Sequence, residues 1–225
     1  MNINLFGICL ISVSVALIAP ANAGCPPGLT LADVAPPTDI SRTFIRKGLG
    51  EYGADRKGGT KKHSGADITT RLTTTDPMAY AVFAVAEGVV AYAKFNGLTY
   101  DDGWGQVIIL DHGNDCYSMY AHLAASPFIP WADDKAQPFM VKLGEKVTKG
   151  QHIGFFVDID KGLDSTGNAQ RTAAGARWQT HFELIEAPSG RAGSGTIKGD
   201  IFGNDGKSVD PTALLLDLGY KIEDL

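Results

Sequence analysis

The sequence has little positive charge, few cysteines and no apolar run of clear membrane-spanning length. Its 20 Lys and Arg are outnumbered by 25 Asp and Glu, and the formal net charge is -5. This balance argues against nucleic-acid binding and against a strongly basic binding surface, since both need an excess of cations. The sequence also has no run of like charges, no low-complexity tract and no clear repeat. What remains is the composition of a globular domain.

The N-terminus carries an apolar run from Leu5 to Ile18, followed by Ala21-Asn22-Ala23, which is the small-x-small pattern of signal-peptide cleavage. The run is short for a membrane span. Because no Lys or Arg precedes it, an uncleaved anchor stays open as an alternative. Cys25 suggests a lipoprotein, but Asn22 stands where a lipobox has an aliphatic residue. We predict that residues 1–23 are removed, that the protein is periplasmic or extracellular, and that it has no stable membrane span.

The predicted export determines which of the three cysteines remain and places them in an oxidising compartment. Cys9 falls in the predicted signal segment, which leaves Cys25 and Cys116 in the mature chain. Two cysteines in an oxidising compartment can pair. Two unpaired thiols are the alternative, because Cys25 lies close to the mature terminus. Neither cysteine has the spacing of a zinc ligand.

The composition also points to a fold class. The 27 glycines fit many short strands joined by tight turns, and 225 residues with 44% hydrophobic content can bury one good core. Residues 24–41, which contain Pro26-Pro27 and Pro36-Pro37, are expected to run extended, and residues 42–225 to form one domain. We predict a mainly β fold, a compact antiparallel sandwich or barrel-like domain with long groove-forming loops.

Local patterns predict two hairpins, one further strand and one short helix: residues 81–85 with 89–93, 107–110 with 117–123, 178–185, and 212–218. Two long connections, 124–140 and 155–177, separate these elements. Long loops in a compact domain are often binding loops, and surface decoration is the alternative.

Four residues have the chemistry of a metal site: His63, Asp67, His122 and His181. Two imidazoles and one carboxylate are the three-ligand set of catalytic zinc, which leaves a fourth position for water. Taken singly, each histidine has the ordinary alternative of a satisfied core or surface residue. The Ser64-Gly65 pair argues against a helix between His63 and Asp67, so the helical zinc motif does not apply.

The surroundings of these residues resemble the M23 family of zinc metallopeptidases, the lysostaphin-like or LytM-like cell-wall endopeptidases. His63-Ser64-Gly65-Ala66-Asp67 matches the family's His-x-Gly-x-Asp, and Tyr120-Ala121-His122-Leu123 matches its Tyr-x-His-Leu. Thr180-His181-Phe182-Glu183-Leu184 matches the end of its His-x-His-Phe-Glu. Other similar stretches follow in family order: residues 85–90, 104–114, 141–154 and 209–211. The resemblance covers roughly residues 42–215 and implies a β fold with bound zinc.

The resemblance implies that His63, Asp67 and His181 are the zinc ligands. It also implies two catalytic histidines that are not ligands, of which His122 is present and the other is replaced by Gln179. Residues two apart on a strand face the same way, so Gln179 and His181 should both point at the metal. Glutamine can donate or accept a hydrogen bond, but it cannot shuttle a proton near neutral pH.

By resemblance, we expect a zinc-dependent metalloendopeptidase that cleaves peptidoglycan stem peptides or cross-links with metal-activated water, slowed by Gln179. The alternative is a catalytically degenerate zinc-binding regulator or binding module that acts with other cell-wall hydrolases. The complete ligand set favours the enzyme, and Gln179 favours the regulator. A lipoyl-like carrier domain, suggested by residues 141–154, fails for want of a lysine at a hairpin tip. The remaining histidines, His112 and His152, are expected to be surface residues.

Overall fold

The structure, a computed structural model, describes residues 32–71, 74–96, 104–126, 138–158, 178–187 and 207–225. The strands in this part are β1 (Thr43–Arg46), β2 (Asp55–Arg56), β3 (Lys61–Lys62), β4 (Ala66–Thr70), β5 (Ala81–Phe83), β6 (Gly88–Asn96), β7 (Gly105–Asp111), β8 (Cys116–Ala124), β9 (Lys146–Val147), β10 (His152–Asp158), β11 (Trp178–Glu186), β12 (Lys207–Val209) and β13 (Ile222–Glu223). The helical elements are the 3-10 turns η1 (Gly48–Gly50), η2 (Lys57–Gly59) and η3 (Pro77–Tyr80), and the α-helix α2 (Thr212–Asp217).

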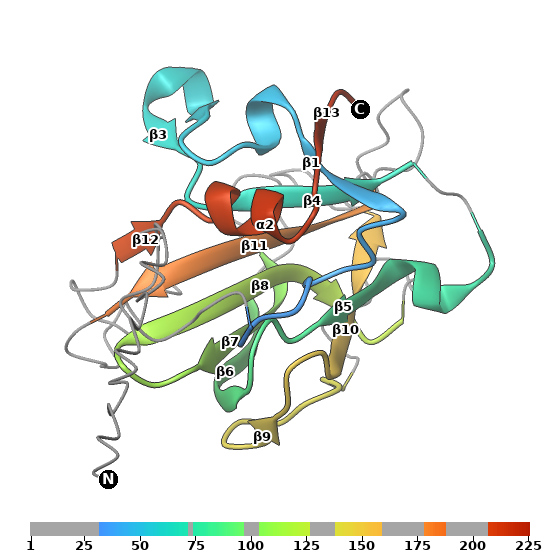
Figure 1. The fold of residues 1–225 in the computed structure, drawn as a ribbon, viewed down its shortest axis with the longest axis vertical. Helices are drawn as coiled ribbons and strands as arrows, with labels where there is room; N and C mark the ends of the chain where they lie inside the picture. The colour runs from blue at the N-terminus through green and yellow to red at the C-terminus, as the bar shows by residue number, and fades with distance from the viewer. Residues whose placement is uncertain (1–31, 72–73, 97–103, 127–137, 159–177, 188–206) are drawn as a thin grey trace, which may run out of the picture.

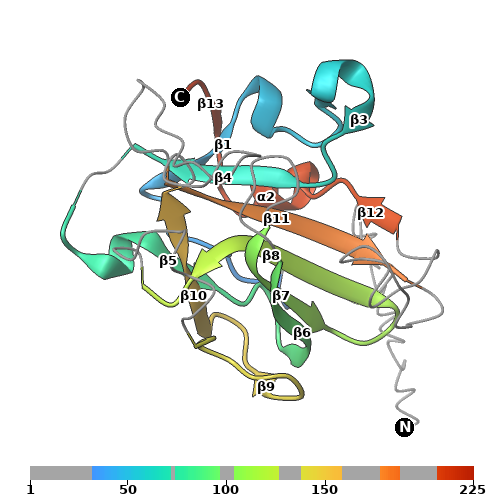
Figure 2. The same cartoon turned by 180° about the vertical axis from the view of Figure 1, so that it is seen from behind.

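Most of these strands form one large sheet (Figures 1 and 2). Its 11 strands run in the order β13-β1-β4-β11-β10-β8-β7-β6-β9, with β12 paired to β11 and β5 paired to β10. Within the described residues, β1 and β13 are parallel and the other pairings are antiparallel. The β2–β3 pair forms a separate two-stranded hairpin. The predicted mainly β, antiparallel fold is therefore confirmed.

The two faces of the sheet bury two separate apolar clusters. Along β7, Ile108 and Leu110 belong to the larger cluster and Val107 and Ile109 to the smaller one, as strand alternation requires. Helix α2 lies over β4 and β11 in Figure 1 and adds Leu215 to the larger cluster. On β11, the alternate residues Gln179, His181 and Glu183 place polar side chains on the face of the smaller cluster. This face carries the candidate site.

Three of the predicted elements are confirmed. Strands β7 and β8 form an antiparallel hairpin, β11 spans the predicted strand, and α2 lies within the predicted helix. Strand β11 pairs with β4 along one edge and with β8 and β10 along the other. It is therefore central in the sheet, which explains why eight of its nine residues are buried.

The predicted hairpin of residues 81–85 with 89–93 is wrong. Strand β5 pairs with β10, and β6 pairs with β7 and β9. Between them, the N–H groups of Ala84 and Val85 donate to Gln151 O and to the Tyr120 hydroxyl. These long-range partners satisfy the backbone that a local hairpin would have paired, and periodicity alone does not reveal them.

The predicted loop boundaries also change. Residues 155–158 belong to β10, where Phe155 and Phe156 pair with the end of β8, so the second long connection starts later than predicted. Most of both connections, residues 127–137 and 159–177, lies outside the described residues, and their role as groove-forming loops stays a prediction.

The predicted signal segment also lies outside the described residues, so its cleavage and export stay predictions. In the part of the chain that is described, no helix combines the length and the hydropathy needed to cross a membrane. Cys116 is disulfide-bonded, so the alternative of a free thiol there is wrong. Cys9 and Cys25 both lie outside the described residues, and the pairing with Cys25 stays a prediction.

Candidate functional site

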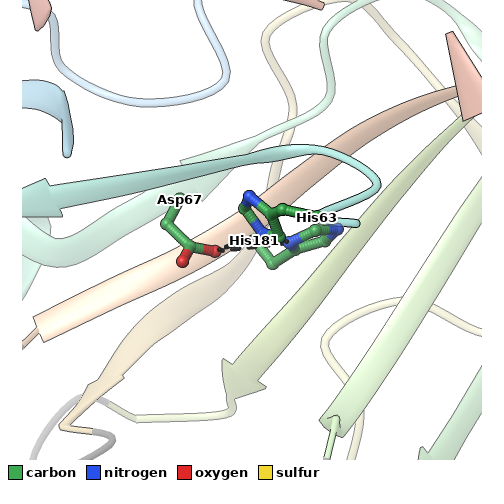
Figure 3. Close-up of side chains that lie close together, drawn as sticks. All are labelled: His63, Asp67 and His181. Carbon is green, nitrogen blue, oxygen red and sulfur yellow. Dashed lines mark hydrogen bonds and ion pairs between the residues drawn. The ribbon is translucent and has the colours of Figure 1, made fainter. Parts of the chain in front are cut away.

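Three of the predicted residues point their side chains at one common point (Figure 3). Asp67 on β4 is paired across the sheet with His181 on β11, and His63 stands just before β4. His63 Nε2 lies 3.0 Å from His181 Nδ1 and 3.2 Å from Asp67 Oδ1, and His181 Nδ1 lies 3.3 Å from Asp67 Oδ1. All three residues are buried. Strand register thus brings together side chains separated by more than a hundred residues.

The three atoms are spaced as a tetrahedral metal requires. Zinc with bonds of about 2.0–2.1 Å places neighbouring ligand atoms about 3.3–3.4 Å apart. The observed distances of 3.0 to 3.3 Å lie slightly below or at this spacing. The donor set also fits, since two imidazole nitrogens and one carboxylate oxygen form a catalytic zinc site. Among the residues that the structure describes, this is the group that could hold a metal.

The hydrogen bonds made by the outer ring nitrogens of His63 and His181 determine which ring nitrogen faces the metal position. His63 Nδ1 donates to the backbone oxygen of Glu51 at 2.9 Å, and His181 Nε2 donates to Glu183 Oε2 at 3.2 Å. The opposite nitrogens, His63 Nε2 and His181 Nδ1, therefore turn their lone pairs toward each other and toward Asp67. Lone pairs facing each other at 3.0 Å repel unless a cation lies between them, which is the arrangement of histidine ligands held by outer partners.

The electrostatics of the group favour a bound cation. Burial alone raises the pKa of Asp67, but the hydrogen bonds and charges of His181 and His63 outweigh it and hold that pKa well below its usual value. Burial alone lowers the pKa of His181, but hydrogen bonds to Asp67 and Glu183 outweigh it and raise that pKa. Both shifts favour a proton held between the carboxylate and the imidazole, and a metal ion would compete with that proton.

Glu183 is a site residue that the sequence reasoning did not assign. Its side chain is 0% exposed and is held by the hydroxyls of Ser64, at 3.0 Å to Oε2, and Ser208, at 2.5 Å to Oε1. It lies two residues beyond His181 on β11, so both side chains point to the same face. That alternation was the signal that could have identified it as the partner of His181.

Gly65 allows the close approach of the two histidine segments. A Cβ at this position would lie 2.7 Å from His181 Nε2, closer than real side chains approach. Only glycine therefore leaves His181 free to reach Glu183 while His63 stays beside it.

A second unassigned residue, Arg56, contacts the carboxylate of this group. Its Nη2 donates to Asp67 Oδ2 at 2.8 Å. No sequence pattern pointed to this contact, because Arg56 lies on the short β2–β3 hairpin, outside the matched motif.

A β-bulge positions His122. Gln106 pairs with Leu123 and Ile108 with Tyr120, so two residues of β8, Ala121 and His122, lie opposite one residue of β7. His122 has φ of 56°, in the left-handed region that few non-glycine residues adopt. Ala121 belongs to the smaller cluster and Leu123 to the larger one, so the extra residue lets His122 stay on the site face.

Trp104 packs against both His122 and His181. Its ring stacks on His122 with 5.8 Å between centroids and meets His181 edge-on at 5.0 Å. The His122 and His181 rings are 6.3 Å apart, so His122 lies beside the metal group without belonging to it. Burial lowers the pKa of His122 to about 3, so its imidazole is neutral near pH 7 and offers one nitrogen as a hydrogen-bond acceptor and the other as a donor.

Gln179 occupies the position on β11 two residues before His181. It pairs with Thr69 of β4, two register positions from the Asp67–His181 pair, and is only 3% exposed. Its Oε1 is buried and makes no hydrogen bond to any described part of the chain. An unsatisfied buried amide costs about 1–3 kcal/mol, so it needs an explanation beyond packing.

The other two histidines are not the simple surface residues that the sequence suggested. His112 Nδ1 donates to Glu87 O at 2.7 Å, its Nε2 lies 2.7 Å from Ser118 Oγ, and burial lowers its pKa. His152 packs against Phe83 and Phe155 and bonds Gly154 O. Both rings are thus partly buried and hydrogen-bonded, and neither contacts the metal group.

Comparison with known proteins identifies a family. A sequence model of peptidase family M23 matches residues 61–189, which is more than half of the 225 residues. The match contains His63, Asp67, His122, Gln179 and His181. No curated protein sequence matches the chain.

Several solved structures are similar. The solution structure of lysostaphin has a TM-score of 0.48 and 20% identity, over 87% of this chain and 59% of that one. A zinc-containing peptidase from Vibrio cholerae has a TM-score of 0.43 and 15% identity, over 85% and 41%. The peptidase lysostaphin from Staphylococcus simulans has a TM-score of 0.42 and 23% identity, over 78% and 51%. The chain thus spans less than two thirds of the length of each of these proteins.

Proposed function

Since the chain belongs to peptidase family M23, we propose that it is an exported zinc metalloendopeptidase that hydrolyses peptide bonds of peptidoglycan. The observation that carries the proposal is the convergence of His63 Nε2, Asp67 Oδ1 and His181 Nδ1, with the outer nitrogens of both histidines held by Glu51 and Glu183. Export rests on the apolar run and cleavage pattern of residues 1–23.

His63, Asp67 and His181 would hold the zinc ion. When bound, zinc supplies Lewis-acid activation of a water molecule and of the scissile carbonyl. The three protein ligands leave a coordination position open, which distinguishes catalytic from structural zinc sites. Glu183 and the Glu51 carbonyl keep the two imidazoles in the tautomers that present a lone pair inward.

His122 would handle the proton of the reaction. Its neutral imidazole lies beside the metal group and is held by the bulge of β8 and by Trp104. It would act as the general base, or donate a hydrogen bond to the negative charge that develops on the substrate carbonyl. Because it is not a ligand, its removal should leave metal binding intact.

Gln179 would donate a hydrogen bond to the same developing charge. Its amide N–H is the donor for that bond, whereas the buried Oε1, which has no partner in the described residues, would accept a hydrogen bond from a substrate N–H. A glutamine cannot shuttle a proton, so the activity should be weaker than with an imidazole, by about 10²–10⁴-fold.

A zinc-binding regulator of other cell-wall hydrolases is the second candidate, and Gln179 is the observation that favours it. The same metal group would then stabilise the fold or bind wall peptides without turnover. A single substitution distinguishes the two candidates. Gln179→His should raise turnover if the site is that of an impaired enzyme.

The test is digestion of purified peptidoglycan by the mature protein, with and without a zinc chelator. Weak, chelator-sensitive release of peptides in the wild type, faster in Gln179→His and absent in His122→Ala, supports the enzyme. Inactivity of both the wild type and Gln179→His on several peptidoglycan types supports the regulator. A wild type faster than Gln179→His would mean that glutamine is the adapted catalytic residue.

A further inference from the structure

The two oxygens of Asp67 have different partners. Oδ1 faces His63 and His181, at 3.2 and 3.3 Å, whereas Oδ2 accepts from Arg56 Nη2 at 2.8 Å. The Asp67 side chain is 4% exposed and that of Arg56 is 29% exposed. Arg56 thus reaches from a partly exposed hairpin to the buried oxygen that does not face the histidines.

The register of the β2–β3 hairpin aims Arg56 at the site. Arg56 pairs with Lys61, and Asp55 pairs with Lys62. Residues directly opposite each other share a face, and Asp55 and Lys62 form an ion pair at 2.5 Å on the other face. Lys61 therefore lies on the same face as Arg56, is exposed, and carries the same charge.

The base of this hairpin is His63 itself. His63 N donates to Ala54 O at 2.9 Å, and Gly53 N donates to His63 O at 2.8 Å. Gly53 has φ of 76°, so Gly53 and Ala54 form a glycine bulge opposite His63. The β2–β3 hairpin and its glycine bulge therefore hold Arg56 in a fixed position relative to His63.

We propose that Arg56 is a positioning residue that restricts Asp67 to one-oxygen coordination and so keeps a position on zinc open for reaction. The inference rests on the proposed zinc function. A carboxylate can bind a metal through one oxygen or two, and a guanidinium that remains charged at all ordinary pH values keeps Oδ2 engaged. In the described residues Arg56 Nε is buried without a hydrogen-bond partner, a cost that a freely solvated arginine would not carry.

Cobalt substitution tests the coordination directly, because four-coordinate Co²⁺ absorbs visible light more strongly than Co²⁺ with more ligands. In Arg56→Met, Asp67 gains its second oxygen contact, so we expect weaker absorption at full cobalt occupancy. On soluble peptidoglycan fragments, kcat should fall about 10–100-fold with KM little changed. Lys61→Met is the matched control, since it removes a neighbouring cation without touching Asp67, and it should keep both the spectrum and kcat.

Two further variants protect the test from a folding defect. Arg56→Lys and Arg56→Gln each retain an N–H donor, and we expect spectra closer to wild type than that of Arg56→Met. If wild type binds cobalt and all Arg56 variants share its spectrum, the inference is overturned and the proposed function stands. A spectral change in Lys61→Met equal to that in Arg56→Met would also overturn it, since charge alone would explain the effect. A wild type that binds neither zinc nor cobalt overturns the proposed function and this inference together.

Discussion

The left-handed backbone of His122 predicts an unusual order of stability between two substitutions. Alanine normally stabilises a strand relative to glycine, because glycine loses more conformational freedom on folding. At φ of 56° the preference should reverse. We therefore expect His122→Gly to be more stable than His122→Ala, although glycine fills less space.

The magnitude follows from two opposing effects. A side chain with a Cβ costs about 1–2 kcal/mol in the left-handed region, a cost that glycine avoids. The greater freedom of glycine in the unfolded chain costs about 0.5–1 kcal/mol. At the midpoints of these two ranges His122→Gly is ahead by about 0.75 kcal/mol, or about 1.5–3 °C in melting temperature for a protein of this size. Both variants lack the imidazole, so its own contacts cancel in the comparison.

Urea unfolding of the zinc-loaded variants measures this difference. The control is Ala121→Gly, at the adjacent position of the same bulge, where φ is not positive and glycine should lower the free energy of unfolding by about 1 kcal/mol. Both His122 variants should keep one zinc per chain and lack peptidase activity. If His122→Ala equals or exceeds His122→Gly in stability, the bulge does not strain this residue and our account of how it is positioned is wrong.

Three further predictions concern the metal group and export. His181→Ala should lose zinc, and Glu183→Gln should weaken zinc binding about 10–100-fold because a neutral amide replaces the carboxylate that accepts from His181 Nε2. Chelator competition measures both, and full occupancy in His181→Ala contradicts the ligand assignment. Gly65→Ala should cost about 1–3 kcal/mol and weaken zinc binding, because its Cβ would crowd His181 at 2.7 Å; unchanged affinity by the same assay counts against this packing argument. Mass spectrometry of the exported protein should find Gly24 as the first residue, whereas an intact Met1 or an acylated Cys25 contradicts the predicted cleavage.

The sequence predicted the elements whose signal is local. Alternation of polar and apolar residues identified β11, and the turn at 112–114 identified the β7–β8 hairpin. It failed for residues 81–93, where both segments look like strands but pair with β10, β7 and β9. Periodicity reports that a residue lies on a strand and which way it faces, but it carries no information about the neighbouring strand.

The same distinction separates the predicted from the missed residues of the site. The roles proposed for His63, Asp67 and His181 came from a recognisable motif, whereas Arg56 and Glu183 act by contacting those residues. Glu183 could have been inferred from its alternation with His181, because both belong to one strand. Arg56 could not, because its contact depends on the fold of a hairpin that ends at His63.

The metal group and His122 depend on different features of the sheet. Asp67 and His181 meet through regular pairing of β4 with β11, the kind of contact that any intact sheet preserves. His122 faces the site only because β8 contains one residue more than β7 opposite it. A change that removes the bulge would turn His122 toward the other face while leaving the three metal-group residues in place. The proposed metal binding and the proposed catalysis therefore depend on separate features of the fold, so zinc content alone would not report activity, and the two must be measured independently in every variant.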